Sequence, residues 1–195
     1  MGEKERRGQP AVTTAAADWP DVERLFGVRG EPSSCWCRFF ALSGPQWSAT
    51  TPEQRKDQLR DRFGDGGPAP GVLAFRDGNP VGWCAVEPRT CYPRILRSRI
   101  WSVTCFVVAP GERRTGVAGA LLAAAVGHAA AHGATVLEGY PVDPAQRPKA
   151  GSADLYHGTL GLFLRAGFSV VSDAVPGRAV VRLTGPRPGA APPSA

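Results

Sequence analysis

Residues 105–122 read CFVVAPGERRTGVAGALL, a β-branched and aromatic run that turns through Pro-Gly into an alanine-rich segment. This order predicts a strand, a turn and a helix in direct succession. The first N–H groups of a helix have no intrahelical partner and lie at the positive end of its dipole, so a phosphate can bind there. Gly116 and Gly119 leave that approach open, while Arg113 and Arg114 add positive charge. The stretch therefore predicts an anion-binding loop.

Two segments of the chain carry a resemblance to a known family. Residues 108–118, VAPGERRTGVA, match the pattern V-x-P-x-x-[RQ]-x-x-G-x-[GA], and residues 162–168, LFLRAGF, are similar to L-Y-x-x-x-G-F. These are the pyrophosphate loop and the end of the last helix in the GNAT superfamily of acyl-coenzyme A-dependent N-acyltransferases. The resemblance implies a mixed α/β fold, in which a mostly antiparallel central sheet is splayed between two central strands and flanked by helices.

The resemblance also implies that acetyl-CoA is the acyl donor, held mainly by main-chain groups, and that no metal takes part. A backbone N–H of the central strand is expected to polarise the thioester carbonyl. The cofactor contacts expected on this basis are Phe106, Val107, Val108, Arg113, Arg114, Thr115, Gly116, Val117, Ala118, Gly119 and Phe163.

The leaving thiolate needs a proton donor, and here the sequence departs from the family. The family usually places a tyrosine four residues before the glycine that follows its last helix, but counting back from Gly167 gives Phe163, which has no proton to donate. Tyr156 lies seven residues earlier, two turns along the same face if residues 153–166 form one helix. Tyr156 is therefore a candidate acid, and its alternative role is that of a half-buried tyrosine. Water, serine or threonine could protonate the thiolate instead.

Candidate general bases lie on the strand expected at residues 135–142. Glu138 and Tyr140 share one face of that strand because side chains alternate with a period of two. A charged residue in the middle of a strand favours a function, although a solvated sheet face explains it equally well. Asp143 and Glu87 are further candidates.

The acceptor side is expected to include Cys35, Trp36, Trp83 and Trp101. In the family, the segment between the first two helices lines the acceptor pocket, which would place Cys35 and Trp36 in its wall. The alternatives are thiols packed as small hydrophobic groups and tryptophans that belong to the core. A Cys-x-Cys pair is a weak zinc signal, and His128 with His132 lacks a third ligand on the same helix.

The charged residues 1–10 and the Pro-, Gly- and Ala-rich residues 185–195 are expected to be disordered tails around a single GNAT-like domain at 11–184. Residues 92–99 are ambiguous between loop and helix. The helices expected are 19–26, 51–63, 116–132 and 153–166. The strands expected are 71–76, 81–87, 100–108, 135–142, 168–171 and 180–183.

The 195 residues are 43% hydrophobic, carry a net charge of +6 and include five cysteines. An odd cysteine count, a charged N-terminus and the lack of a long apolar run indicate a cytoplasmic protein without a membrane segment. The positive charge suits the phosphates of coenzyme A. Nucleic acid is not expected, because aromatic residues are not interleaved with the basic ones. A monomer or a homodimer is expected.

The function that this pattern predicts is transfer of acetyl from acetyl-CoA to a primary amine. Direct attack in a ternary complex is favoured, because no Cys-His or Ser-His arrangement for a covalent relay is discernible. One alternative is a CoA-binding regulatory protein with weak turnover, which the phenylalanine at position 163 favours; another is a basic nucleic-acid-binding protein. Polyamines, antibiotics, amino acids and protein amines all remain open as acceptors.

Overall fold

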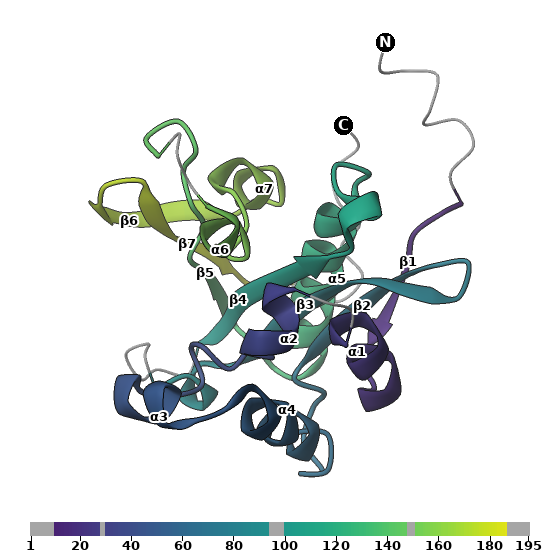
Figure 1. Ribbon diagram of the computed structural model, residues 1–195. Helices are drawn as coiled ribbons and strands as arrows, with labels where there is room; N and C mark the ends of the chain where they lie inside the picture. The colour runs from purple at the N-terminus through teal and green to yellow at the C-terminus, as the bar shows by residue number, and fades with distance from the viewer. Residues whose placement is uncertain (1–9, 28–29, 94–99, 148–150, 187–195) are drawn as a thin grey trace.

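The computed structural model describes residues 10–27, 30–93, 100–147 and 151–186. A seven-stranded sheet in the order β1-β2-β3-β4-β5-β7-β6 runs through the molecule (Figure 1). The strands are β1 Thr13–Ala16, β2 Gly71–Arg76, β3 Asn79–Pro88, β4 Trp101–Val108, β5 Val136–Gly139, β6 Ser169–Val175 and β7 Arg178–Thr184. β4 and β5 pair in parallel, and the other paired neighbours are antiparallel.

Helices cover both faces of the sheet. The helices are α1 Trp19–Phe26, α2 Glu31–Cys35, α3 Gly44–Ala49, α4 Pro52–Asp61, α5 Val117–Ala131, α6 Ser152–Leu155 and α7 Leu160–Arg165, with 3-10 turns η2 Arg89–Cys91 and η3 Pro110–Glu112. α5 packs on one face of the sheet, where its buried Leu121 and Ala125 join the larger core cluster. Residues of α1 and α4 pack on the other face around Trp83. The mixed α/β fold class predicted from the sequence is confirmed.

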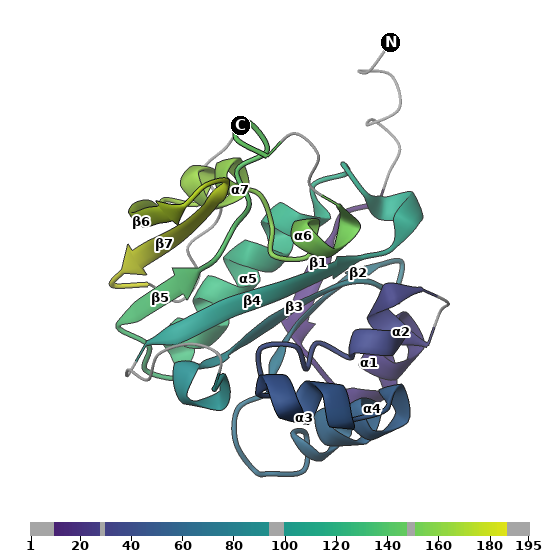
Figure 2. The same ribbon diagram turned by 60° about the vertical axis from the view of Figure 1, so that its left-hand side comes forward.

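The sheet splays apart between β4 and β5. Their pairing runs from Trp101↔Leu137 to Val103↔Gly139 and then stops, although β4 continues to Val108. Thr104 is the extra residue of a β-bulge on β4, because Ala85 pairs with Cys105 whereas the next residue of β3 pairs with Val103. Backbone groups of β4 after Val103 are therefore available to something other than β5 (Figure 2).

The prediction of one helix over residues 153–166 is wrong. α6 ends at Leu155 and α7 begins at Leu160, with Gly158 between them at a φ of +76°. Val142 N–H donates to Gly158 O at 3.0 Å, and Leu160 N–H donates to Val142 O at 2.8 Å. Because these backbone groups bond to a neighbouring segment, they cannot form a continuous helical ladder. The argument that Tyr156 and Phe163 share one helix face therefore fails.

Most other predicted elements agree with the structure within a few residues. β5 ends at Gly139, earlier than the predicted strand over residues 135–142. β1, α2 and α3 were not predicted. The predicted tails lie largely in residues 1–9 and 187–195, and the ambiguous stretch largely in 94–99, all outside the described residues. In the described part of the chain, no helix has the length and apolar character needed to cross a bilayer.

Candidate active site

The anion-binding loop joins the end of β4 to the start of α5. Gly116 is the N-cap of α5 with a φ of +92°, a conformation that side-chain-bearing residues rarely adopt. A Cβ added at Gly116 or at Gly119 would meet nothing within 4 Å. Ala120 N–H donates to Gly116 O at 3.1 Å, so the N–H groups of the preceding three residues lie ahead of the first intrahelical bond. The loop thus presents backbone N–H groups at the start of α5 that no intrahelical bond uses.

Arg76, on β2, holds this loop in place through contacts with Glu112 and Thr115. Its side chain is 9% exposed, and Arg76 Nε lies 2.9 Å from Glu112 Oε2. Arg76 Nη2 donates to Thr115 Oγ1 at 3.2 Å, and that hydroxyl donates to Glu112 O at 2.7 Å. Arg114, between them, has a left-handed φ of 65°. The Thr115 hydroxyl, predicted to contact the cofactor, therefore takes part in holding the loop.

Tyr156 and His157 form hydrogen bonds with the part of β4 that no longer pairs with β5. Phe106 N–H donates to Tyr156 O at 2.6 Å, and His157 Nδ1 lies 3.0 Å from Thr104 O. α6 lies beside the C-terminal half of β4 (Figure 2). We call residues 156–158 the splay segment. It occupies hydrogen-bonding positions of β4 that β5 leaves free, including the Phe106 N–H, which is expected to polarise a thioester.

His157 has a defined tautomer in this position. A carbonyl oxygen can only accept, so the Nδ1 of His157 carries the proton that Thr104 O receives, and Nε2 of the neutral ring keeps its lone pair. Burial lowers the pKa of His157 below 6.5, against the opposing effect of the Thr104 carbonyl. Among the described residues, no hydrogen-bond donor contacts Nε2. His157 is therefore a neutral imidazole at pH 7 with a free basic nitrogen.

Tyr156 lies next to β4 even though the helical argument for it fails. It caps the C-terminus of α6, and its side chain packs with the cluster that includes Cys105. Burial, followed by the nearby Glu31 carboxylate, raises the pKa of Tyr156 to about 12, and Arg113 lowers it. The hydroxyl of Tyr156 therefore stays protonated at neutral pH. Tyr156 lies between the anion-binding loop and the splay.

The arrangement of loop, bulged strand and splay can be compared with known proteins. A family model described as the acetyltransferase (GNAT) family matches residues 36–151, more than half of the 195 residues. The chain belongs to the GNAT acetyltransferase family.

Solved structures of several acetyltransferases share the fold. yncA from Salmonella typhimurium, determined with its cofactor acetyl-CoA, is 15% identical with a TM-score of 0.57, covering 95% of this chain and 99% of that one. A ribosomal-protein-alanine N-acetyltransferase from Brucella melitensis is 20% identical (TM-score 0.56, coverage 88% and 99%). PaiA N-acetyltransferase from Thermoplasma acidophilum, in complex with coenzyme A, is 14% identical (TM-score 0.55, coverage 89% and 99%). No curated protein matches this sequence.

The side chains of Glu138, on β5, and Tyr140, just after β5, lie on the same side and touch, but their contacts argue against a basic role. Glu138 is 1% exposed, and its carboxylate lies 3.0 Å from Arg89 Nη1 and 2.7 Å from Arg182 Nε. Tyr140 OH donates to the same carboxylate at 2.8 Å. Burial raises the pKa of Tyr140 above its ordinary value. A carboxylate neutralised by two guanidinium groups is a weak proton acceptor, so we assign Glu138 to stability.

We expect Glu138→Gln to destabilise the fold by about 3 kcal/mol, because it removes the charge of a buried carboxylate that pairs with Arg89 and Arg182. Urea unfolding followed by circular dichroism measures the change. Glu23→Gln is the matched control, since it removes a carboxylate that pairs with Lys56 at the surface, and it should change stability little. Full stability with lost turnover in Glu138→Gln would restore Glu138 as a base.

The other carboxylates named from the sequence are also engaged. Glu87 is 4% exposed and accepts from Arg62 Nη2 at 2.8 Å and from Arg62 Nε at 3.1 Å. Asp143 accepts from the N–H of Ala145 at 3.0 Å and from the Gln146 amide at 3.1 Å. Neither carboxylate is bonded to the splay segment by these contacts.

The aromatic residues expected at the acceptor side belong to the core instead. Trp83 is 0% exposed and packs on Phe26, and Trp101 is 7% exposed and packs on His128 and His132. Trp36 is 4% exposed. A tryptophan sealed in the core cannot contact an acceptor, so this prediction is corrected for all three.

Four further residues named from the sequence behave differently from one another. Cys35 is half-buried, and burial raises its pKa to about 11. Phe163 is fully buried against Phe106 and Phe168, which argues against a contact between its ring and a cofactor. His128 is half-buried with Nε2 3.1 Å from Ala69 O, whereas His132 is exposed. The described residues contain no group of three potential metal ligands.

Aromatic side chains form a wall beside His157. The His157 ring lies edge-on to Phe40 at 5.2 Å, and Phe40 stacks on Tyr140 at 6.0 Å. Sequence reasoning missed His157 because it placed the residue inside a helix. The glycine that follows it was the available signal, since a glycine within a helical pattern lowers confidence in that helix.

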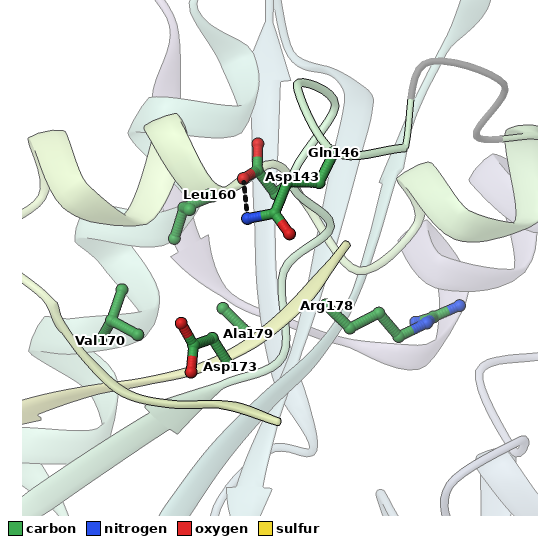
Figure 3. A pocket seen from close by; sticks show the side chains of 7 residues that line it. All are labelled: Asp143, Gln146, Leu160, Val170, Asp173, Arg178 and Ala179. Atoms are coloured by element: carbon green, nitrogen blue, oxygen red, sulfur yellow. Dashed lines mark hydrogen bonds between the residues drawn. The ribbon is translucent and has the colours of Figure 1, made fainter. Parts of the chain in front are cut away.

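A separate hollow of about 70 Å³ lies by β6 and β7 (Figure 3). It is lined by Asp143, Gln146, Leu160, Val170, Asp173, Arg178 and Ala179. It contains no residue of the anion-binding loop or the splay segment, and it is much smaller than ordinary ligand pockets of about 300 Å³ or more. This hollow is therefore separate from the loop and from the splay segment.

Proposed function

We propose that this GNAT protein transfers the acetyl group of acetyl-CoA to a primary amine by direct attack in a ternary complex. The observation that carries the proposal is the open first turn of α5, with Gly116 as a left-handed N-cap and Arg76 bracing the loop. These donors suit a pyrophosphate, whose charge Arg113 and Arg114 would complement. GNAT relatives solved with acetyl-CoA or coenzyme A support the same ligand.

The thioester oxygen needs a hydrogen-bond donor as negative charge grows on it, and Phe106 N–H is the candidate. That N–H now donates to Tyr156 O at 2.6 Å, so acetyl-CoA has to displace this carbonyl. The side chains of Phe106 and Val107 are buried in the core, which leaves their main chain for cofactor contact. The thioester would then lie beside the splay segment.

Two side chains near the splay suit the proton transfers. The free Nε2 of His157 can take a proton from the attacking amine, because the ring is neutral and held by Thr104 O. Tyr156 keeps its proton at neutral pH and can supply it to the departing thiolate. Phe40 and Tyr140 form an apolar wall that favours the neutral amine over the ammonium ion.

A CoA-binding protein with weak turnover is the second candidate. The Phe106–Tyr156 hydrogen bond favours it, because this bond occupies the group that would polarise the thioester. Acetyl-CoA turnover with a library of amines, read as released thiol, separates the two candidates. Turnover with any amine supports the enzyme, whereas binding without turnover of any tested amine supports the regulatory protein. A cytoplasmic location, a single domain and a monomeric or homodimeric state remain predictions from composition.

We expect acetyl-CoA to raise the melting temperature, because a ligand that binds only the folded state adds RT ln(1 + [L]/Kd), about 2.7 kcal/mol at a hundredfold excess over Kd. Differential scanning fluorimetry measures the shift. Acetyl-pantetheine, which lacks the pyrophosphate, serves as the control and should give a much smaller shift. An unchanged melting temperature at millimolar acetyl-CoA would rule out the proposed cofactor.

A further inference from the structure

Two cysteines far apart in the chain meet beside the splay. Cys37 Sγ lies 3.0 Å from Cys105 Sγ. Cys105 belongs to β4 and directly precedes Phe106, whereas Cys37 lies in the turn after α2. A disulfide has an S–S length of about 2.05 Å, so the two sulfur atoms need to approach by about 1 Å to form one.

The backbone holds Cys37 in this place at a conformational cost. Trp36 and Cys37 have consecutive left-handed φ values of 48° and 50°, which residues with a Cβ rarely adopt. The buried Trp36 ring packs on Trp19 at 5.9 Å and on Phe26 at 5.4 Å, which fixes the turn. Core packing of the neighbouring residue, and not the thiol itself, thus holds Cys37 against β4.

The remaining cysteines lack a comparable partner in the structure. Cys84 is fully buried, with Sγ 3.9 Å from Ala85 O. Cys91 Sγ lies 3.9 Å from Arg62 Nη2. Cys35 precedes the strained turn, and its thiol interacts with the backbone of Cys37, Arg38 and Phe39. Only Cys37 and Cys105 lie at a sulfur–sulfur distance from which a bond can form without rearranging the fold.

We propose that Cys37 and Cys105 are a modification site, where a peroxide oxidant forms a disulfide between the turn after α2 and β4. One thiolate attacks the peroxide oxygen, which gives a sulfenic acid and releases water or an alcohol. The second thiol then attacks the sulfenic sulfur, the S–S bond forms and a second water leaves. The two sulfur atoms together lose two electrons, and the peroxide gains them.

The burial of Cys37 and Cys105 affects how readily the disulfide forms. Burial raises the pKa of Cys37 well above its ordinary value, so the thiol form dominates at neutral pH and attack by the Cys37 thiolate is slow. Both residues are half-buried, which leaves access for a small oxidant. Once formed, the bond would tie the turn that precedes Phe39 and Phe40 to the strand that carries Phe106 N–H.

The test is oxidation of the folded full-length chain with hydrogen peroxide, followed by thiol counting after denaturation and by peptide mapping. Five free thiols should fall to three, since the pair consumes two, with one cross-link between the peptides that contain Cys37 and Cys105. Dithiothreitol should restore all five. A cross-link to another cysteine, or unlinked oxidation products alone, would overturn the proposal. This measurement on the wild-type chain depends neither on a variant nor on acetyltransferase activity.

Serine variants give a second, independent arm. Cys37→Ser and Cys105→Ser should each keep all four remaining thiols under the same treatment. Cys35→Ser is the matched control, because it lies two residues from Cys37 but leaves both sulfur atoms of the pair in place, and it should fall from four thiols to two. Disulfide formation at an unchanged rate in folded Cys37→Ser would contradict the assignment.

Discussion

Replacement of Gly116 by glutamate is expected to lower the affinity for acetyl-CoA by at least about 100-fold, or roughly 2.7 kcal/mol. The new carboxylate would project into the open space in front of the α5 N–H groups, where nothing lies within 4 Å of a Cβ. It would repel the pyrophosphate and compete for the same donors. Isothermal titration calorimetry measures the loss directly.

Gly133→Glu is the control for backbone strain. Gly133 also has a positive φ, of +82°, and also opens onto free space, but it follows the C-terminal end of the same helix. Both variants should lose similar stability, and only Gly116→Glu should lose binding. Equal affinity in the two folded variants would show that the first turn of α5 is not the pyrophosphate site.

His157→Gln is expected to lower kcat by about 100-fold, because general base catalysis contributes at least this much. The glutamine amide can still donate to Thr104 O, so the local structure should persist while the basic nitrogen is lost. The measurement is kcat with a saturating amine, under conditions in which chemistry limits the rate. His132→Gln is the control, since that exposed histidine stacks on Trp101 away from the splay segment.

The pH dependence separates a basic role from a structural one. Burial lowers the pKa of His157, so the imidazole is neutral, and able to accept a proton, from neutral pH down to below 6.5. In the wild type, kcat/KM should therefore fall only on the acid side, with its midpoint below pH 6.5. His157→Gln should lose this acid limb while keeping its affinity for acetyl-CoA. An unchanged limb in the variant would assign the titration to another group.

The strand, turn and helix around Gly116 could be predicted because their signals are local. A β-branched strand, a Pro-Gly turn and an alanine-rich helix occur in immediate succession, and the structure places Gly116 at the N-cap. The buried Arg76 that braces the loop could not be predicted, because it comes from another strand, 39 residues before Thr115 in the chain. Its two loop contacts exist only once β2 and the loop are brought together.

The residues around the splay were harder to predict for a related reason. Residues 153–166 have a helical pattern, but Val142 competes for the backbone groups on both sides of Thr159 and breaks the helix. Local propensity could not reveal this tertiary contact, and the error hid His157. Glu138 was correctly placed on one face with Tyr140, yet its role depends on Arg89 and Arg182, which lie on other segments.

If acetyl-CoA has to displace the Tyr156 carbonyl from Phe106 N–H, as proposed, the splay has to open before the acetyl group can bind. Only the open fraction can bind the acetyl group, so the observed dissociation constant equals the intrinsic one divided by that fraction. One such hydrogen bond stabilises the closed form by about 1 kcal/mol, which weakens the observed affinity about fivefold. A substitution that loosens the Tyr156 carbonyl would therefore tighten cofactor binding without touching the cofactor, and the Phe106 amide would exchange its hydrogen faster in the free protein.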